Sequence, residues 1–137
     1  NARTPMQWDE SKNAGFSTGQ PWLTVNPNYE EINVQEALAN PDSIFYTYQK
    51  LVQIRKENSW LIRADFELLD TTDKVFAYIR KDGDRRFLVV ANLSNEKQNF
   101  SVEGKVKSVL IENTTAKKAV EKQTLAPWDA FCVEMTD

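Results

Sequence analysis

The chain has 137 residues, 41% of them hydrophobic, with four tryptophans and seven phenylalanines, which is enough to fill a core of its own. Its net charge of −3 argues against nucleic-acid binding, and its longest apolar run, residues 87–91, is far shorter than the roughly 20 residues that span a bilayer. The lack of histidine excludes histidine-based catalytic triads and zinc sites, and we expect no metal and no cofactor.

The first 32 residues are predicted to form a long ordered loop. The stretch from Asn1 to Phe16 contains a glycine, aromatic rings, an arginine and small polar residues, but it has neither a helical nor a strand period. Loops with aromatic rings and a lone arginine are where binding surfaces are usually built. This loop-rich arm is therefore the candidate binding segment.

Two helices are predicted after the arm. Asn33 is followed three positions later by Glu36, a capping pattern that predicts a short helix over residues 33–39. Asn40-Pro41 fits an N-cap followed by proline at the first helical position, which predicts a second helix over residues 42–58. The apolar residues of the second helix follow the stripe of an amphipathic helix: Ile44, Tyr48, Leu51 and Val52.

From about residue 64 the apolar period changes to two, as in β-strands. The turn Asp82-Gly83-Asp84 separates two strongly alternating segments and predicts a β-hairpin. Short strands at this spacing favour an antiparallel β-sandwich, so the predicted fold class is mainly β, preceded by the arm and one or two helices. The predicted strands cover residues 66–69, 74–80, 86–93, 98–102, 105–111 and 130–135.

Two blocks of the arm carry a specific resemblance. Residues 2–9 read Ala-Arg-Thr-Pro-Met-Gln-Trp-Asp, and residues 21–29 form a Pro-Trp-x-x-Val-Asn-Pro-Asn-Tyr run. This pattern resembles α-glucosidases of glycoside hydrolase family 13, the α-amylase superfamily, in the oligo-1,6-glucosidase and glucan 1,6-α-glucosidase branch. The likeness continues through the second predicted helix and, more loosely, to Leu125-Ala-Pro-Trp128, so it covers the whole chain.

The resemblance implies a domain organisation. It covers only the last quarter of the family's length, so we expect the chain to be a C-terminal fragment of a larger enzyme. Residues 1–62 would be the last loop and helix of a (β/α)8 catalytic barrel, and residues 63–137 the all-β C-terminal sandwich domain. Trp60 is expected to pack where helix and sandwich meet. Without the barrel, apolar residues of the arm and stripe lack partners, and we expect the isolated chain to self-associate.

Arg3 is the candidate substrate-binding residue. The resemblance puts its loop after the eighth barrel strand, on the face where such barrels build their active sites. A planar guanidinium can donate two hydrogen bonds to sugar hydroxyls, although Arg3 could equally hold its own loop by bonding backbone carbonyls. Further candidates, each also explained by packing or by tying the chain, are Gln7, Trp8, Phe16, Trp22, Trp128 and Phe131.

No catalytic residue is expected in this chain. A glycosidase needs two carboxylates about 5–10 Å apart, and the adjacent pairs Asp9-Glu10 and Glu30-Glu31 point to opposite sides of an extended chain. The resemblance puts the nucleophile and the acid/base in upstream barrel loops, so the chain alone should be inactive. Cys132, the single cysteine, has no cationic neighbour in sequence and is interpreted as a buried residue, not a reactive thiol.

The resemblance implies a retaining exo-α-glucosidase that acts on α-1,6-linked glucosides of the isomalto-oligosaccharide or dextran type. The expected partner is then an oligosaccharide, with neither nucleic acid nor membrane, and the expected location is the cytoplasm. Two alternatives remain open. One is a sucrose isomerase, which shares the Arg-Thr-Pro motif, and the other is a non-catalytic β-sandwich module that binds carbohydrate or another protein.

Overall fold

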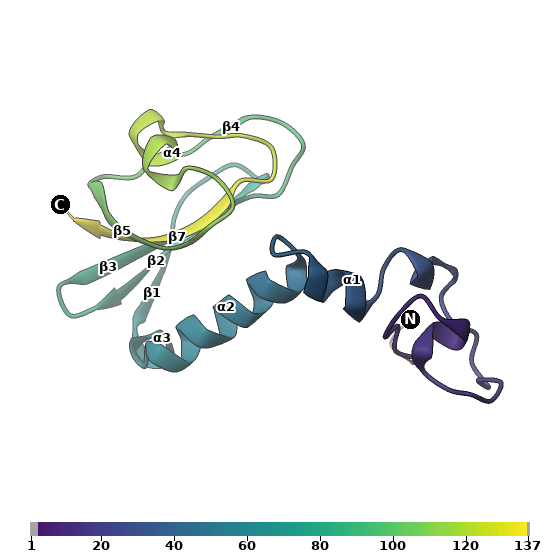
Figure 1. The fold of residues 1–137 in the computed structure, drawn as a ribbon. Coiled ribbons are helices and arrows are strands. Elements are labelled where there is room, and N and C mark those ends of the chain that lie inside the picture. The colour runs from purple at the N-terminus through teal and green to yellow at the C-terminus, as the bar shows by residue number, and fades with distance from the viewer. Residues whose placement is uncertain (1–2, 137) are drawn as a thin grey trace. The chain divides into compact units, whose positions relative to one another are not determined.

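The computed structural model describes residues 3–136, so the Asn1-Ala2 start of the arm and the final Asp137 lie outside it. The chain forms two compact units, one ending at Gln53 and the other beginning at Ile54 (Figure 1). No helix among the described residues is long and apolar enough to cross a membrane.

The N-terminal unit is mostly irregular chain with short helical segments, as its lack of period predicts. The boundary between the two units lies after Gln53, inside the longest helix, so only the first part of that helix belongs to the N-terminal unit. The elements are the 3₁₀ segments η1 (Lys12–Gly15) and η2 (Pro27–Glu30), and the helices α1 (Val34–Ala39) and α2 (Ile44–Glu57).

The start of α1 is held by the arm. The Asn33 side chain accepts a hydrogen bond from the Glu36 backbone N–H at 2.9 Å, which confirms the predicted N-cap. The backbone N–H groups of Val34 and Gln35 donate to the carbonyls of residues 7 and 8, at 2.9 and 3.0 Å. Since the first N–H groups of a helix have no acceptor within it, the arm supplies the acceptors that α1 lacks.

The start of α2 differs from the prediction. Residues 41–43 form a turn, the Asn40 side chain accepts from the Asp42 backbone N–H at 2.9 Å, and the helix begins only at Ile44. Asn side chains readily bond to the backbone two residues on, and this local turn competes with the helix that the Asn-Pro pattern predicted. The apolar stripe does lie on α2, and all of its members are exposed: Ile44, Tyr48, Leu51 and Val52.

The C-terminal unit is built on a five-stranded antiparallel sheet in the order β1-β2-β3-β7-β5, which confirms the mainly β fold class. The predicted hairpin joins β2 to β3, with Gly83 at a φ of +59° in the two-residue turn. The elements of this unit are α3 (Trp60–Arg63), β1 (Asp65–Leu68), β2 (Val75–Asp82), β3 (Arg85–Asn92), β4 (Gln98–Asn99), β5 (Lys105–Glu112), α4 (Ala116–Lys122), β6 (Thr124–Leu125) and β7 (Ala130–Thr136).

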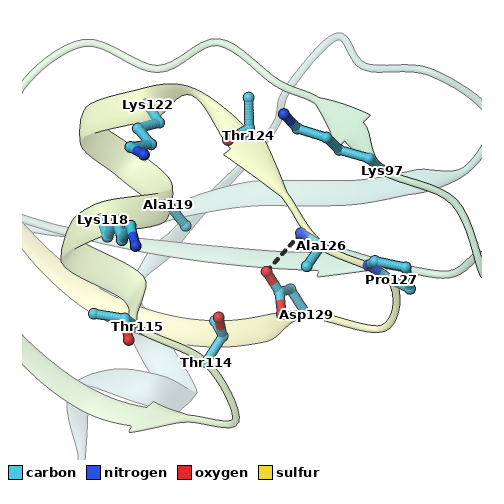
Figure 2. A pocket seen from close by; sticks show the side chains of 10 residues that line it. All are labelled: Lys97, Thr114, Thr115, Lys118, Ala119, Lys122, Thr124, Ala126, Pro127 and Asp129. Atoms are coloured by element: carbon cyan, nitrogen blue, oxygen red, sulfur yellow. Dashed lines mark hydrogen bonds between the residues drawn. The ribbon is translucent and has the colours of Figure 1, made fainter.

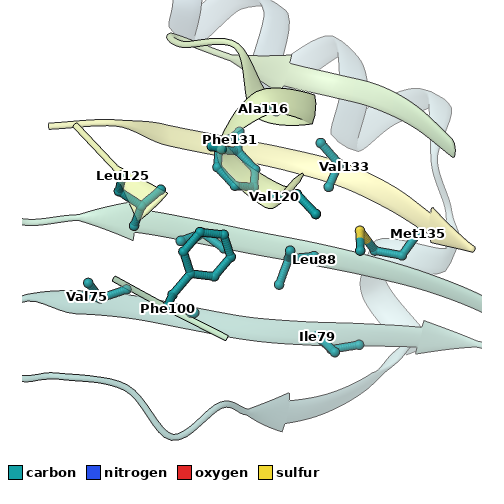
Figure 3. Packing of buried hydrophobic residues seen from close by; sticks show 13 residues of the cluster. Val75, Ile79, Leu88, Phe100, Ala116, Val120, Leu125, Phe131, Val133 and Met135 are labelled. Atoms are coloured by element: carbon teal, nitrogen blue, oxygen red, sulfur yellow. The ribbon is translucent and has the colours of Figure 1, made fainter. Parts of the chain in front are cut away.

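One face of the sheet is covered by α4, the short β4–β6 pair and Phe100, which together make the second layer (Figure 3). The strand predicted over residues 98–102 is only two residues long, Gln98–Asn99, because beyond it the backbone of Phe100 and Val102 bonds to the backbone and side chain of Gln123 instead of to a strand. The helix was not predicted, although its buried residues Ala116, Ala119 and Val120 follow the i, i+3, i+4 spacing. The sheet contributes alternate residues to this core: Val75, Ala77, Ile79, Leu88, Val90, Phe131, Val133 and Met135.

The opposite face of the sheet carries an aromatic stack. Trp60 of α3 lies flat on Phe87 of β3, with ring centroids 3.7 Å apart and planes 9° from parallel, and both rings are buried. The indole N–H of Trp60 donates to the Asn58 side chain at 2.9 Å, so this buried donor is satisfied. The prediction that Trp60 packs between the helical segment and the sheet is confirmed.

A buried carboxylate lies next to this stack. Glu134 of β7 accepts hydrogen bonds from the Arg85 side chain at 3.0 and 3.3 Å and from the Lys107 ammonium at 3.0 Å. The bonds from Arg85, followed by those from Lys107, outweigh the effect of burial and hold the pKa of Glu134 at about 2, below its ordinary value of 4.5. Arg85 also lies over the Phe87 ring, 4.7 Å from its centroid, so the ion pair and the stack share a residue.

Replacing Glu134 by glutamine should lower the free energy of unfolding at neutral pH by about 1–2 kcal/mol, because two cations lose their carboxylate and are themselves partly solvated. A depressed pKa in the folded state stabilises fully above pH 4.5 and less and less as the pH falls towards 2. Urea unfolding between pH 7 and pH 2.5 should therefore show a steeper acid loss in the parent chain than in Glu134→Gln. The control is Glu67→Gln, which breaks the exposed Lys81–Glu67 pair, and equal acid slopes in parent and Glu134→Gln would contradict the assignment.

Candidate functional site

Arg3 lies against Trp22 in the arm. The guanidinium carbon is 5.5 Å from the centre of the Trp22 ring, and both side chains are exposed. A guanidinium at this distance from a ring makes a cation–π contact with it. Among residues 3–136 no carboxylate forms an ion pair with Arg3. Arg3 thus presents hydrogen-bond donors on an aromatic support.

Gln7 ties two segments of the arm together. Its side-chain amide donates to the Asn28 side chain at 3.2 Å and to the backbone carbonyl of Ile32. An amide nitrogen has two N–H donors, and both are used here. This geometry fits the interpretation of Gln7 as a residue that ties the chain. Its backbone carbonyl also accepts a hydrogen bond from the Val34 N–H at the start of α1.

The arm turns sharply at η1. Asn13 and Ala14 both have a φ near +60°, and the Asn13 amide donates to the carbonyls of Ser17 and Gly19 at 2.9 and 3.0 Å. Gly15 continues the turn at a φ of +65°, and a Cβ there would lie 2.6 Å from an Asp9 carboxylate oxygen. The arm is therefore an ordered loop with a specific backbone path, as predicted.

Among the carboxylates of the arm, Asp9 helps to hold this turn. The Asp9 side chain accepts from the hydroxyl and the backbone N–H of Ser11, and these hydrogen bonds lower the pKa of Asp9. Glu30 ends η2, and Glu31 follows it, with both side chains exposed. In the described chain, the Asp9 carboxylate is thus used to hold the turn.

Two further aromatic residues of the arm, Trp8 and Phe16, are half exposed. Trp8 and Phe16 have 50% and 49% of their surface accessible, and Trp22 has 83%. Rings that pair with the apolar C–H faces of sugars need such accessible surface, and so do rings that pack on a neighbouring domain. Chemically, this arm can bind and orient a hydroxyl-rich ligand.

In the C-terminal unit the predicted aromatic pair divides into two roles. Phe131 belongs to the core, as the packing explanation has it, whereas Trp128 is 59% exposed at the turn that precedes β7. Cys132 is partly buried, and burial raises the pKa of its thiol to about 11. A thiol that stays protonated at neutral pH is a poor nucleophile, as expected for a structural cysteine.

The sequence did not predict a hollow of about 410 Å³ on the C-terminal unit, between α4 and the turn at residues 126–129 (Figure 2). Nine of its ten lining residues lie between Thr114 and Asp129, around the helix α4 that the sequence analysis did not predict, and the tenth is Lys97. Among the described residues, no group of three His, Cys, Asp or Glu side chains could hold a metal ion, here or elsewhere. The hollow is lined chiefly by lysines and threonines: Lys97, Thr114, Thr115, Lys118, Lys122 and Thr124.

Comparison with known families accounts for nearly the whole chain. Residues 1–64 match the family described as Alpha amylase, catalytic domain, and residues 66–132 match Maltogenic Amylase, C-terminal domain. The chain belongs to glycoside hydrolase family 13, the α-amylase superfamily. The arm and α2 thus fall in the catalytic-domain match of this family 13 chain, and the sheet falls in the C-terminal-domain match.

Several proteins of family 13 are closely similar to this chain. A glucan 1,6-alpha-glucosidase from Streptococcus pneumoniae is 90% identical over 98% of this chain and 25% of that protein, and an oligo-1,6-glucosidase from Bacillus cereus is 43% identical over 98% and 25%. The solved structure of an isomaltulose synthase from Klebsiella sp. LX3 has a TM-score of 0.88 at 31% identity, over 99% of this chain and 25% of that one. The chain spans about a quarter of the length of the curated relatives it matches.

Proposed function

We propose that this chain is the C-terminal portion of a retaining exo-α-glucosidase that hydrolyses α-1,6-linked glucosides in the cytoplasm. The observation that carries the proposal is the 90% identity to a glucan 1,6-alpha-glucosidase over nearly the whole chain. In this proposal residues 1–62 complete the catalytic barrel, and residues 63–137 form the C-terminal β domain. The family matches over residues 1–64 and 66–132, and the start of β1 at Asp65, support that division.

A retaining glucosidase uses a carboxylate nucleophile and a carboxylic acid/base, and it passes through a covalent glucosyl intermediate. In the proposed enzyme these are an Asp and a Glu from the barrel that precedes this chain. The chain's own contribution is to bind and position the sugar, and Arg3 is suited to it. Because Trp22 already supports the guanidinium, Arg3 loses less freedom when its edge N–H groups donate to sugar hydroxyls.

The exposed apolar residues of the N-terminal unit support the proposal that another part of the enzyme packs against this unit. The stripe on α2 and the half-exposed Trp8 and Phe16 leave more apolar area open than isolated surface residues need. In the proposed enzyme the rest of the barrel covers them. In the isolated chain a second copy is the available apolar surface, which is why we expect self-association.

A sucrose isomerase is the second candidate, because the isomaltulose synthase structure aligns over 99% of the chain. The products of the reaction distinguish this candidate from the proposed α-glucosidase. A hydrolase given isomaltose releases glucose, whereas an isomerase given sucrose yields a second disaccharide. The much higher identity to the glucosidase favours hydrolysis.

Arg3→Ala in the full-length enzyme should lower kcat/KM for isomaltose by roughly 5- to 150-fold, or about 1–3 kcal/mol, if Arg3 donates to a sugar hydroxyl. The measurement is steady-state glucose release by the parent and the variant. Arg63→Ala removes an exposed arginine from the last turn of α3 and serves as the matched control, with kinetics like those of the parent. Unchanged kcat/KM in Arg3→Ala would assign Arg3 to loop structure, and a parent that releases no glucose would refute the proposed activity.

A further inference from the structure

The face of the sheet opposite the core, called the outer face below, is apolar across several strands. Val75, Ala77 and Ile79 of β2 belong to the core, so the alternate residues Phe76 and Tyr78 lie on the outer face. Residues that are paired across antiparallel strands project on the same side of a sheet, which extends this face to β1, β3 and β7. The apolar residues and the thiol that it gathers are Phe66, Leu68, Phe76, Tyr78, Phe87, Val89 and Cys132.

Three rings of the outer face contact one another and remain accessible. The centroid of the Tyr78 ring is 5.0 Å from that of Phe66 and 5.4 Å from that of Phe76. Phe66 and Phe76 are 58% and 47% exposed, and Leu68, which pairs with Tyr78, is 61% exposed. Contiguous apolar surface of this kind marks an interaction site, whereas single exposed apolar residues do not.

One end of the outer face is already covered by residues of the catalytic-domain match. That match ends at Ala64, and α3, which lies within it, places Trp60 flat on Phe87. Arg80 of β2 fastens the same segment, because its guanidinium donates to the backbone carbonyls of Leu61 at 3.0 Å and Ala64 at 2.8 Å. The last residues of the catalytic-domain match are therefore seated on this face.

The accessible rings continue directly from the seated segment. Phe66 pairs with Arg80 across β1 and β2, so the ring cluster begins beside the residue that fastens α3. Only residue 65 separates the two family matches, which leaves almost no flexible chain between the catalytic domain and the sheet. A surface tethered by a short linker has an effective concentration of about millimolar, so a second copy of the protein competes poorly for the same face.

We propose that the outer face is an interface on which the part of the catalytic domain outside this chain packs, and that it buries Phe66, Phe76 and Tyr78. The choice of this partner rests on the proposed function, in which a catalytic barrel precedes the chain. The surface itself rests on the contiguous rings and on the α3 segment already seated beside them.

Hydroxyl-radical footprinting of the dilute 137-residue chain and of the full-length enzyme, at equal radical dose, tests the proposal. Phe66, Phe76 and Tyr78 should be oxidised in the isolated chain, and their oxidation should fall several-fold in the full-length enzyme. Equal oxidation in the two proteins would overturn the proposal. So would protection that rises with the concentration of the isolated chain and is missing from the full-length enzyme, because the occupant would then be a second copy.

Phe76→Glu separates an interface role from a role in folding. Because Phe76 is half exposed, the isolated variant should keep the circular dichroism spectrum of the parent chain. In the full-length enzyme the variant should restore the oxidation of Phe66, since a carboxylate buried at an interface without a partner is strongly unfavourable. Continued protection of Phe66 in this variant would count against the interface.

Lys117→Glu is the matched control, because it places the same side chain at an exposed position of α4, in the layer that covers the opposite face. It should leave the protection of Phe66 unchanged. Glucose release from isomaltose by the full-length protein is measured separately. Protection without hydrolysis would refute only the proposed function, and hydrolysis without protection would refute only this interface.

Discussion

Phe87→Ala is expected to lower the free energy of unfolding by about 3–5 kcal/mol, the usual cost of emptying a buried phenylalanine site. Phe87 is fully buried, stacks on Trp60 and lies under the Arg85 guanidinium. Its loss therefore opens a cavity, frees the indole and removes the support of an arginine that also pairs with Glu134. Against a typical total stability of about 5–15 kcal/mol, this loss is a large fraction of the free energy that keeps the unit folded.

Urea unfolding followed by near-ultraviolet circular dichroism measures this effect, since the Trp60 signal depends on its stacked partner. Phe76→Ala is the matched control, because this phenylalanine lies on neighbouring β2 and is 47% exposed. Its replacement should cost less than about 1.5 kcal/mol. Equal losses in the two variants would show that the stack does not stabilise the unit.

Gly104→Ala is expected to lower the free energy of unfolding by about 3 kcal/mol or more. Gly104 precedes β5 at a φ of +101°, and a Cβ there would lie 2.2 Å from the Thr136 carbonyl oxygen of β7. That oxygen belongs to backbone in a paired strand and cannot move without shifting the β5–β7 register. The variant therefore carries both a strained φ and a clash.

Gly83→Ala separates the two contributions. Gly83 also has a positive φ, +59°, but no atom lies within 4 Å of a Cβ built there. The strain alone should cost about 1 kcal/mol. Thermal unfolding of both variants gives the difference, and a Gly104→Ala variant no less stable than Gly83→Ala would mean that β5 and β7 approach less closely than described.

The sheet was predictable because its strand segments are rich in apolar residues that alternate with polar ones. The alternation is clearest in β2, which buries Val75, Ala77 and Ile79, and Gly83 marks the hairpin between β2 and β3. The N-cap of α1 was also readable, since Asn33 and Glu36 satisfy a local requirement of any helix start. These features depend on residues close in sequence.

Features decided by competition or by distant contacts were not predictable. Asn40-Pro41 fits a helix start, yet the Asn40 side chain bonds to the next turn instead, and α2 begins at Ile44. α4 shows a helical spacing only at three small apolar residues, within a lysine-rich stretch that reads as loop. In both places a weak local signal had a close competitor, and the surrounding structure chose between them.

The candidate sites show the same limit. Arg3 was chosen by its motif, but its contact with Trp22 joins residues nineteen positions apart in irregular chain, where no period relates them. The outer face of the sheet also joins residues far apart in sequence, since Trp60 stacks on Phe87 and Phe66 lies beside Tyr78. Residue identity indicated which side chains mattered, and only the fold indicated what each one touches.

The position of β7 also sets an order of events during synthesis. β7 is made after β5, yet it lies between β3 and β5 in the sheet. Until the ribosome has produced β7, β5 has no place to pair, and the free edge of β3 is open to pairing with another chain. The sheet must therefore close late, when β7 inserts between β3 and β5, and until then the free edge of β3 is exposed to pairing with other newly made chains.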